Sequence, residues 1–186
     1  MNPTPGSAEH CLALAIQHVN AGQPERAKLL CEHALAAHPP HPAVLQLLAV
    51  LCLKEGELER AQLSIAHSLE LRPDHAPSLR VAGDVAHAQG FALALALHDR
   101  RDLAGAEAAL RRVLALGPPR AEVEVNLGVV LQDAGRIDDA MRAYGRAYRL
   151  NEDSFGRIAH ALSAAPVGRL WLALDTLRET LRGLPP

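Results

Sequence analysis

One short stretch of the sequence, "CEHALAAHPPH", carries side chains that are able to bind a metal ion. Cys31, His33, His38 and His41 span the end of a predicted helix and the linker that follows it. Thiolate sulfur and imidazole nitrogen are common zinc ligands, so His38 and His41 could ligate a metal from the linker. The alternative is that Cys31 is a small packing residue and that the histidines complement a helix C-terminus. The Pro-Pro spacer suits a linker that any helix pair needs, so we expect no metal site here.

The rest of the sequence offers no arrangement of residues that is typical of catalysis. It contains no phosphate-binding glycine loop, no H-E-x-x-H pattern, no cysteine pairs at zinc spacing and no nucleophile elbow. The remaining histidines are scattered without a ligand spacing. We therefore expect a protein that is not an enzyme and that needs no cofactor.

The charges are balanced and dispersed along the chain. There are 19 Lys and Arg residues against 21 Asp and Glu residues, a formal net charge of −2. We expect no nucleic-acid partner and no membrane partner, because like charges never cluster beyond a pair and no segment is apolar for long enough to span a bilayer. With no leader-like start, the sequence favours a cytoplasmic protein. Cys11, Cys31 and Cys52 are then expected to be reduced and buried.

The elements that carry these residues recur at a fixed period. The chain is 49% hydrophobic but only 3% aromatic, which favours an all-α fold rich in Ala and Leu. Three sets of markers are spaced by 34 residues, with one excess of 11 between Gly90 and Ala106. The sets are Gly22, Gly56, Gly90 and Gly135; Ala27, Ala61, Ala106 and Ala140; and Pro39, Pro73 and Pro118. A period of this size indicates a repeat of one supersecondary unit.

Each marker has a physical role in a pair of helices. The glycine ends a first helix where the backbone needs a positive φ, which glycine adopts without steric cost. The alanine lies early in a second helix, where a small side chain lets the two helices approach closely. The proline ends the unit, because it cannot continue a helix. The repeating unit is therefore predicted to be helix, turn, helix.

Across residues 8–152 the sequence resembles the tetratricopeptide repeat (TPR) family. The matching positions are Leu14-Ala15, Gly22, Ala27, Ala34 and Pro39; Leu48-Ala49, Gly56, Ala61 and Pro73; Ala106, Leu110 and Pro118; and Leu127-Gly128, Leu131, Gly135, Ala140, Tyr144 and Ala147. The chain departs from the family where Cys11, Leu45 and Glu124 replace an early aromatic residue, and where Glu152 replaces the last proline. The resemblance implies a right-handed superhelical array of antiparallel helix pairs, with about four repeats.

The third repeat is lengthened by 11 residues and allows two frames for its first helix. Either Ala82-Gly83 or Leu93-Ala94 occupies the close-packing site of that helix. Eleven residues make three turns with little rotation, so a longer helix keeps the same face toward its neighbours. We predict one long helix over 77–99, with Phe91 and Leu95 on it. The alternative is two short helices broken at Gly90.

The ends of the chain depart from the repeat pattern. Residues 1–7 are expected to be disordered, and residues 153–186 are expected to hold a capping helix and an apolar tail. The capping helix covers about 154–164, with Asp153 or Ser154 as its N-cap. A final short helix follows the capping-box pair Thr176 and Glu179. The segment around Trp171 is predicted to dock, either as an end cap or in a groove of its own or a neighbouring chain.

In the TPR family the first helices line a concave groove, and the resemblance places the partner-binding residues there. Counting around those helices gives Leu12, Ile16 and Val19; Gln46, Val50 and Leu53; and Val125, Asn126, Val129 and Gln132. This stripe is mostly apolar, and Asn126 alone fits the Lys, Arg and Asn set that grips acidic peptide ends. We expect an adaptor or scaffold that binds an apolar helix or peptide of another protein. The alternatives are a homo-oligomer formed through the groove or end helix, and a stripe that is simply core.

Overall fold

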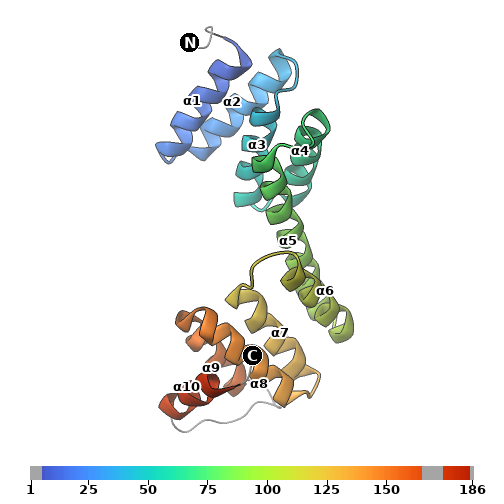
Figure 1. The fold of residues 1–186 in the computed structure, drawn as a ribbon, viewed down its shortest axis with the longest axis vertical. Coiled ribbons are helices and arrows are strands. Elements are labelled where there is room, and N and C mark those ends of the chain that lie inside the picture. The colour runs from blue at the N-terminus through green and yellow to red at the C-terminus, as the bar shows by residue number, and fades with distance from the viewer. Residues whose placement is uncertain (1–5, 165–173, 185–186) are drawn as a thin grey trace. The chain divides into compact units, whose positions relative to one another are not determined.

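A computed structural model describes residues 6–164 and 174–184, and every regular element within those ranges is helical. The elements are α1 (Ala8–Asn20), α2 (Pro24–Ala37), α3 (Pro42–Lys54), α4 (Leu58–Leu71), α5 (Ala76–Asp99), α6 (Leu103–Ala115), α7 (Ala121–Asp133), α8 (Ile137–Leu150), the 3₁₀ turn η1 (Glu152–Ser154), α9 (Phe155–Ala164) and α10 (Leu174–Gly183) (Figure 1). The prediction of an all-α array of helix pairs is confirmed. Among these helices, none is both long and apolar enough to cross a bilayer.

The chain divides into two compact units, each with its own core. Unit 1 covers residues 1–88 and unit 2 covers residues 89–186, so the division falls within α5. In unit 1, α1 packs on α2 and α3 packs on α4 around a core of small side chains such as Ala27, Cys31 and Ala61. In unit 2, α7 packs on α8 around larger side chains, including Tyr144 and Tyr148.

The turn between the two helices of a repeat has the same hydrogen bonds each time. Gly22, Gly56 and Gly135 have φ values of 70°, 79° and 77°, as their placement at the end of a first helix predicts. The residue after each glycine donates its N–H to a carbonyl five residues back, which is the Schellman arrangement. In the third repeat, Arg101 takes this position with φ of 63°, and Asp102 donates to Leu97. Arg101 is therefore the only non-glycine residue with positive φ in the described part of the chain.

The lengthened first helix of the third repeat is a single helix, α5, as predicted. The alternative of a break at Gly90 is wrong, because Gly90 lies inside the helix and is not a turn residue. A Cβ atom at Gly90 would lie 2.7 Å from Cγ2 of Val113. This glycine is thus a contact residue where α5 crosses α6.

Both frames that the sequence allowed for α5 are used, one by each unit. Val81 and Val85, in the earlier frame, are buried in the core of unit 1. Ala94, in the later frame, is buried in the core of unit 2, whereas Gly83 is exposed. The small close-packing residue of the third repeat is therefore Ala94. The extra turns let one helix serve two cores.

The C-terminal helices differ in detail from the sequence prediction. Asn151 caps η1 by accepting the N–H of Asp153, so neither Asp153 nor Ser154 caps α9. The final helix begins at Leu174, which places Thr176 inside α10 and makes the capping-box prediction wrong. Leu177 and Leu181 of α10 are buried in the core of unit 2, and α10 packs against α8. The predicted docking of Trp171 lies outside the described residues, and the end-cap role of this region stays a prediction.

Candidate functional site

The predicted groove positions of unit 1 lie on α1 and α3, two first helices that contact each other. Ile16 is 45% exposed, whereas the other five positions are half-buried. Those that pack partly against the core are Leu12, Val19, Val50 and Leu53, and Gln46 completes the set. These side chains therefore both support the core and remain partly accessible, and their role in binding stays a prediction.

The predicted groove positions of unit 2 lie on α7 and are more enclosed. Val125 is buried, and Gln132 donates to the carbonyl of Ala161 in α9 at 2.8 Å while accepting from Tyr144 at 3.1 Å. Asn126 donates to the carbonyl of Glu122 within its own helix, and Val129 is half-buried against the core. With α9 in place, a partner could reach Asn126 and Val129 but not the side chain of Gln132.

The candidate metal ligands of unit 1 do not come together. Within the described ranges, no group of three or more His, Cys, Asp or Glu side chains is arranged to hold a metal ion. Cys31 is buried in the core, and burial raises the pKa of its thiol to about 12. His33 is exposed, while His38 and His41 are half-buried. Cys11, Cys31 and Cys52 are all free thiols in the structure, as expected.

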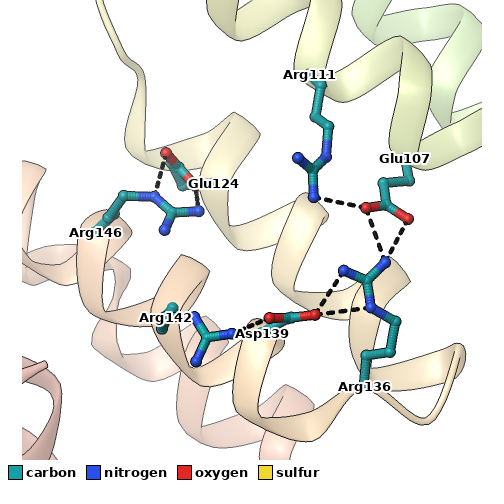
Figure 2. Close-up of polar contacts among 7 residues, drawn as sticks. All are labelled: Glu107, Arg111, Glu124, Arg136, Asp139, Arg142 and Arg146. Atoms are coloured by element: carbon teal, nitrogen blue, oxygen red, sulfur yellow. Dashed lines mark hydrogen bonds and ion pairs between the residues drawn. The ribbon is translucent and has the colours of Figure 1, made fainter. Parts of the chain in front are cut away.

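Unit 2 contains a cavity of about 400 Å³ that we call the arginine pocket. It lies among α6, α7 and α8, and three arginine side chains line it together with two carboxylates and two leucines. Figure 2 shows the charged members of this lining. The lining residues are Arg111 and Leu114 of α6, Glu124 and Leu127 of α7, and Asp139, Arg142 and Arg146 of α8. The pocket therefore combines an excess of positive charge with two leucines, of which Leu114 is half-buried and Leu127 is buried.

The deepest charge in the arginine pocket belongs to Glu124, whose side chain is only 6% exposed. Arg146 holds both carboxylate oxygens, with Nε to Oε1 at 2.9 Å and Nη2 to Oε2 at 3.0 Å (Figure 2). A bidentate pair of this kind compensates for the loss of hydration around a buried carboxylate. Arg146 therefore neutralises the buried Glu124 carboxylate.

The other two carboxylates, Glu107 and Asp139, share Arg136, which is the N-cap residue of α8. Its Nη1 contacts both oxygens of Glu107 at 3.0 and 2.9 Å, and its Nε donates to Asp139 at 2.8 Å. Arg111 also binds Glu107, and Arg142 also binds Asp139 (Figure 2). The hydrogen bond from Arg136 is the main reason that the pKa of Asp139 lies below its usual value. Each of these two carboxylates therefore has two arginine partners.

Unit 1 has a matching network with every charge reversed. The pairs of equivalent positions are Lys28 and Glu107, Glu32 and Arg111, Glu57 and Arg136, and Arg60 and Asp139, each 79 residues apart. The contact of Lys28 with Glu57 at 2.8 Å corresponds to that of Glu107 with Arg136. The contact of Arg60 with Glu57 at 3.1 Å corresponds to that of Asp139 with Arg136. Other contacts differ between the units. Arg60 binds Glu32 on α2, whereas Arg111 binds Glu107 on its own helix. Lys28 also binds Glu55, whose equivalent position in unit 2 is Ala134.

The arginine pocket is not among the sites predicted from the sequence. A usable signal was present, because Arg142 and Arg146 are four residues apart and therefore share one face of a helix. Arg111 occupies the preceding second helix of the array, which the repeat period places next to them. What the period alone does not show is which carboxylates neutralise which arginines.

Two family models match the chain, and both are described as tetratricopeptide repeat. They match residues 18–81 and 125–161, which together make up more than half of the sequence. These matched segments include α2, α3 and α4 in unit 1, and α8 and most of α7 and α9 in unit 2. A search of curated proteins gave no match.

Solved structures with a similar fold cover most of the chain at low sequence identity. MamA from Desulfovibrio magneticus RS-1 is 17% identical with a TM-score of 0.53, covering 81% of this chain and 98% of its own. MamA AMB-1 is 21% identical with a TM-score of 0.50, covering 92% and 90%. TTC0263, a thermophilic TPR protein in Thermus thermophilus, is 22% identical with a TM-score of 0.47, covering 84% and 99%. The family models and the recurring helix pairs agree, and the chain belongs to the tetratricopeptide repeat family.

Proposed function

We propose that this chain is an adaptor that holds an apolar helix or peptide of another protein against the first helices of its repeats. TPR-repeat proteins are generally non-catalytic interaction scaffolds, and membership of the family supports that role in general terms. The proposal goes further by naming the surface, which is the pair of first helices in unit 1.

The observation that carries the proposal is the partial exposure of apolar side chains along α1 and α3. Ile16 is 45% exposed, and Leu12 and Val50 are half-buried on helices that contact each other. An amphipathic helix binds by placing its apolar face in such a groove, with anchors spaced by three or four residues. Covering these side chains with a partner would remove their remaining apolar area from water, which favours binding.

The test compares two exposed apolar residues of unit 1 that lie on different kinds of helix. Ile16→Glu changes the proposed surface, and Leu63→Glu changes a 71% exposed leucine on α4, a second helix. Both side chains are exposed enough to accept a charge without disturbing the core. Partners that co-purify under native conditions with the original chain are identified, purified and tested again for direct binding.

We expect Ile16→Glu to weaken direct binding of the purified partner and Leu63→Glu to leave it unchanged. The opposite pattern, or equal loss in both variants, would contradict the proposed surface. Light scattering on the purified chain separates this function from self-association. A concentration-dependent oligomer that Ile16→Glu abolishes would assign the same surface to a second copy of the chain.

A further inference from the structure

We propose that the arginine pocket of unit 2 binds an acidic segment of a partner protein. In this arrangement Arg111 and Arg142 hold a carboxylate, and an apolar side chain next to it packs on the half-buried Leu114. The site lies among α6, α7 and α8 of unit 2 and shares no residue with the proposed surface on α1 and α3, so it is tested independently of that surface.

The first argument is the balance of charge around the cavity. Four arginines and three carboxylates form the cluster that Figure 2 shows, which leaves one positive charge in excess. Arg111, Arg142 and Arg146 line the cavity itself, whereas the third carboxylate, Glu107, is not among the lining residues. An incoming carboxylate would bring the cluster to neutrality.

The second argument is that each of the three carboxylates has an arginine partner other than Arg111 and Arg142. Glu107 and Asp139 each keep Arg136 as a partner when Arg111 and Arg142 are disregarded. Glu124, in contrast, depends on Arg146. Arg111 and Arg142, which bind Glu107 and Asp139 in the structure, are therefore the two arginines that can turn to an incoming anion while Arg136 still pairs with both carboxylates.

The third argument is the accessibility and donor capacity of these two side chains. Arg111 is 59% exposed and uses Nη2 for Glu107, and Arg142 is 45% exposed and uses Nη2 for Asp139. A guanidinium group carries five N–H donors in a planar fork that matches a carboxylate. Each arginine therefore keeps donors that can face the cavity.

Unit 1 shows that TPR packing does not require this basic cluster. The positions equivalent to Arg111, Arg142 and Arg146 are Glu32, Leu63 and His67. Unit 1 packs α2, α3 and α4 around its own core without arginines at any of these places. The concentration of arginine is thus a particular feature of unit 2.

The apolar side of the cavity decides what kind of anion fits. Leu114 and Leu127 line it together with the charged groups, and a volume of about 400 Å³ exceeds what a single small anion fills. Small-ligand sites of this size combine apolar walls with a few placed polar groups. A peptide that places an acidic residue beside a leucine satisfies both surfaces, whereas phosphate alone satisfies only the arginines.

The experiment measures binding of a fluorescently labelled, capped Leu-Glu-Glu-Leu peptide by anisotropy. The pocket variant is Arg111→Gln with Arg142→Gln, which leaves Glu107 and Asp139 paired with Arg136. The control variant is Arg112→Gln with Arg157→Gln, which removes the same charge from exposed positions that do not line the pocket. Circular dichroism confirms that both variants remain folded, and Leu-Gln-Gln-Leu serves as the uncharged peptide.

We expect the pocket variant to bind the acidic peptide roughly tenfold more weakly than the original chain, and the control variant to bind it within about twofold. Binding should also weaken as sodium chloride is raised, because the contact is between charges. Inorganic phosphate is tested as a competitor in the same assay. The proposal is overturned if phosphate binds while the peptide does not, if the uncharged peptide binds equally well, or if both double variants lose binding equally.

Discussion

In both units ion pairs join one second helix to the next, but the charges at equivalent positions have opposite signs. Lys28, Glu57 and Arg60 connect α2 to α4 in unit 1, and the equivalent positions connect α6 to α8 in unit 2 with every sign exchanged. Both networks meet at the residue that precedes the second helix, which is Glu57 in one unit and Arg136 in the other. The attraction of an ion pair does not depend on which partner is positive. The repeat thus specifies where charges meet and leaves their signs open.

The units also divide volume differently between paired helices. At the close-packing position the four repeats have Ala15, Ala49, Ala94 and Gly128, and sixteen residues later they have Cys31, Ile65, Leu110 and Tyr144. All the second-helix residues of this set are buried. In the fourth repeat the second helix has the largest residue of this set, Tyr144, and the first helix has glycine at position 128. A Cβ atom at Gly128 would lie 2.3 Å from the Tyr144 ring. The largest second-helix residue of the set, Tyr144, therefore faces the smallest first-helix residue, Gly128.

The largest expected effect concerns the buried ion pair that unit 1 lacks. Arg146→Gln leaves Glu124 buried without its partner, and we expect unit 2 to lose about 3 kcal/mol of stability. Unit 1 has the buried Leu45 at the position equivalent to Glu124. Glu124→Leu combined with Arg146→Gln should therefore recover most of the loss. Urea unfolding followed by tyrosine signals measures this, because both tyrosines of the sequence lie in unit 2.

A smaller loss is expected when the volume balance of unit 2 is disturbed. Gly128→Ala places a methyl group against the Tyr144 ring and should destabilise unit 2 by about 2 kcal/mol through overpacking. Combining it with Tyr144→Ile recreates the Ala49 and Ile65 pair of unit 1 and should cost less than the sum of the single changes. Fluorescence of Tyr148 in a urea titration gives the values. Additive losses would show that the two positions are not coupled.

The turn of the third repeat gives an effect of the opposite sign. Arg101→Gly replaces a residue at φ of 63° by one without steric cost, and we expect unit 2 to gain roughly 0.5 to 1 kcal/mol. The contact of Arg101 with Asp133 is 3.4 Å long and exposed, so its loss matters little. The matched change Gly56→Arg should destabilise unit 1. A loss of stability in Arg101→Gly would mean that the arginine side chain stabilises the turn.

The smallest difference is expected in alkali. Burial raises the pKa of the Cys31 thiol from 9.0 to about 12. The neutral, buried thiol therefore contributes its full stabilisation of unit 1 below pH 9.0, and this stabilisation is lost as the pH rises toward 12. Burial also raises the pKa of Tyr144 from 10.0, so the corresponding loss in unit 2 begins at higher pH. Unit 1 should therefore weaken first. Cysteine modification reports on unit 1 and tyrosinate absorbance on unit 2, since all three cysteines lie in unit 1.

The cysteine measurement has a direct control within the chain. Cys31→Ala removes the titrating group, so the onset of unit 1 unfolding should move to higher pH relative to its stability at pH 8. Cys52 is also buried with a raised pKa and stays in place in this variant. An unchanged onset would assign the alkaline sensitivity of unit 1 to Cys52.

Much of the fold follows from the period of the sequence, whereas the candidate site does not. The spacing of Gly22, Gly56 and Gly135 predicts the turns because a positive φ restricts the residue type. Gly90 fits the same spacing but is a contact residue inside a helix. The turn of the third repeat lies at Arg101 instead, and arginine is not a residue type that predicts a positive φ. The arginine pocket depends on which of several nearby charges pair, and long side chains allow many pairings at one spacing. A single sequence thus predicts where the backbone must turn, but it does not predict which charged side chains pair with each other.

The reversed networks have a consequence for how the chain reaches its native arrangement. A folding chain of similar repeats can pair a second helix with the wrong partner, for example α2 with α8 in place of α4. Pairing α2 with α8 would set Lys28 against Arg136, and pairing α6 with α4 would set Glu107 against Glu57. Like charges at these contacts raise the energy of each wrong pairing, whereas each correct pairing joins opposite charges. We therefore expect the exchange of sign to disfavour wrong pairings of second helices between the two units, so that the repeats of this chain are not interchangeable.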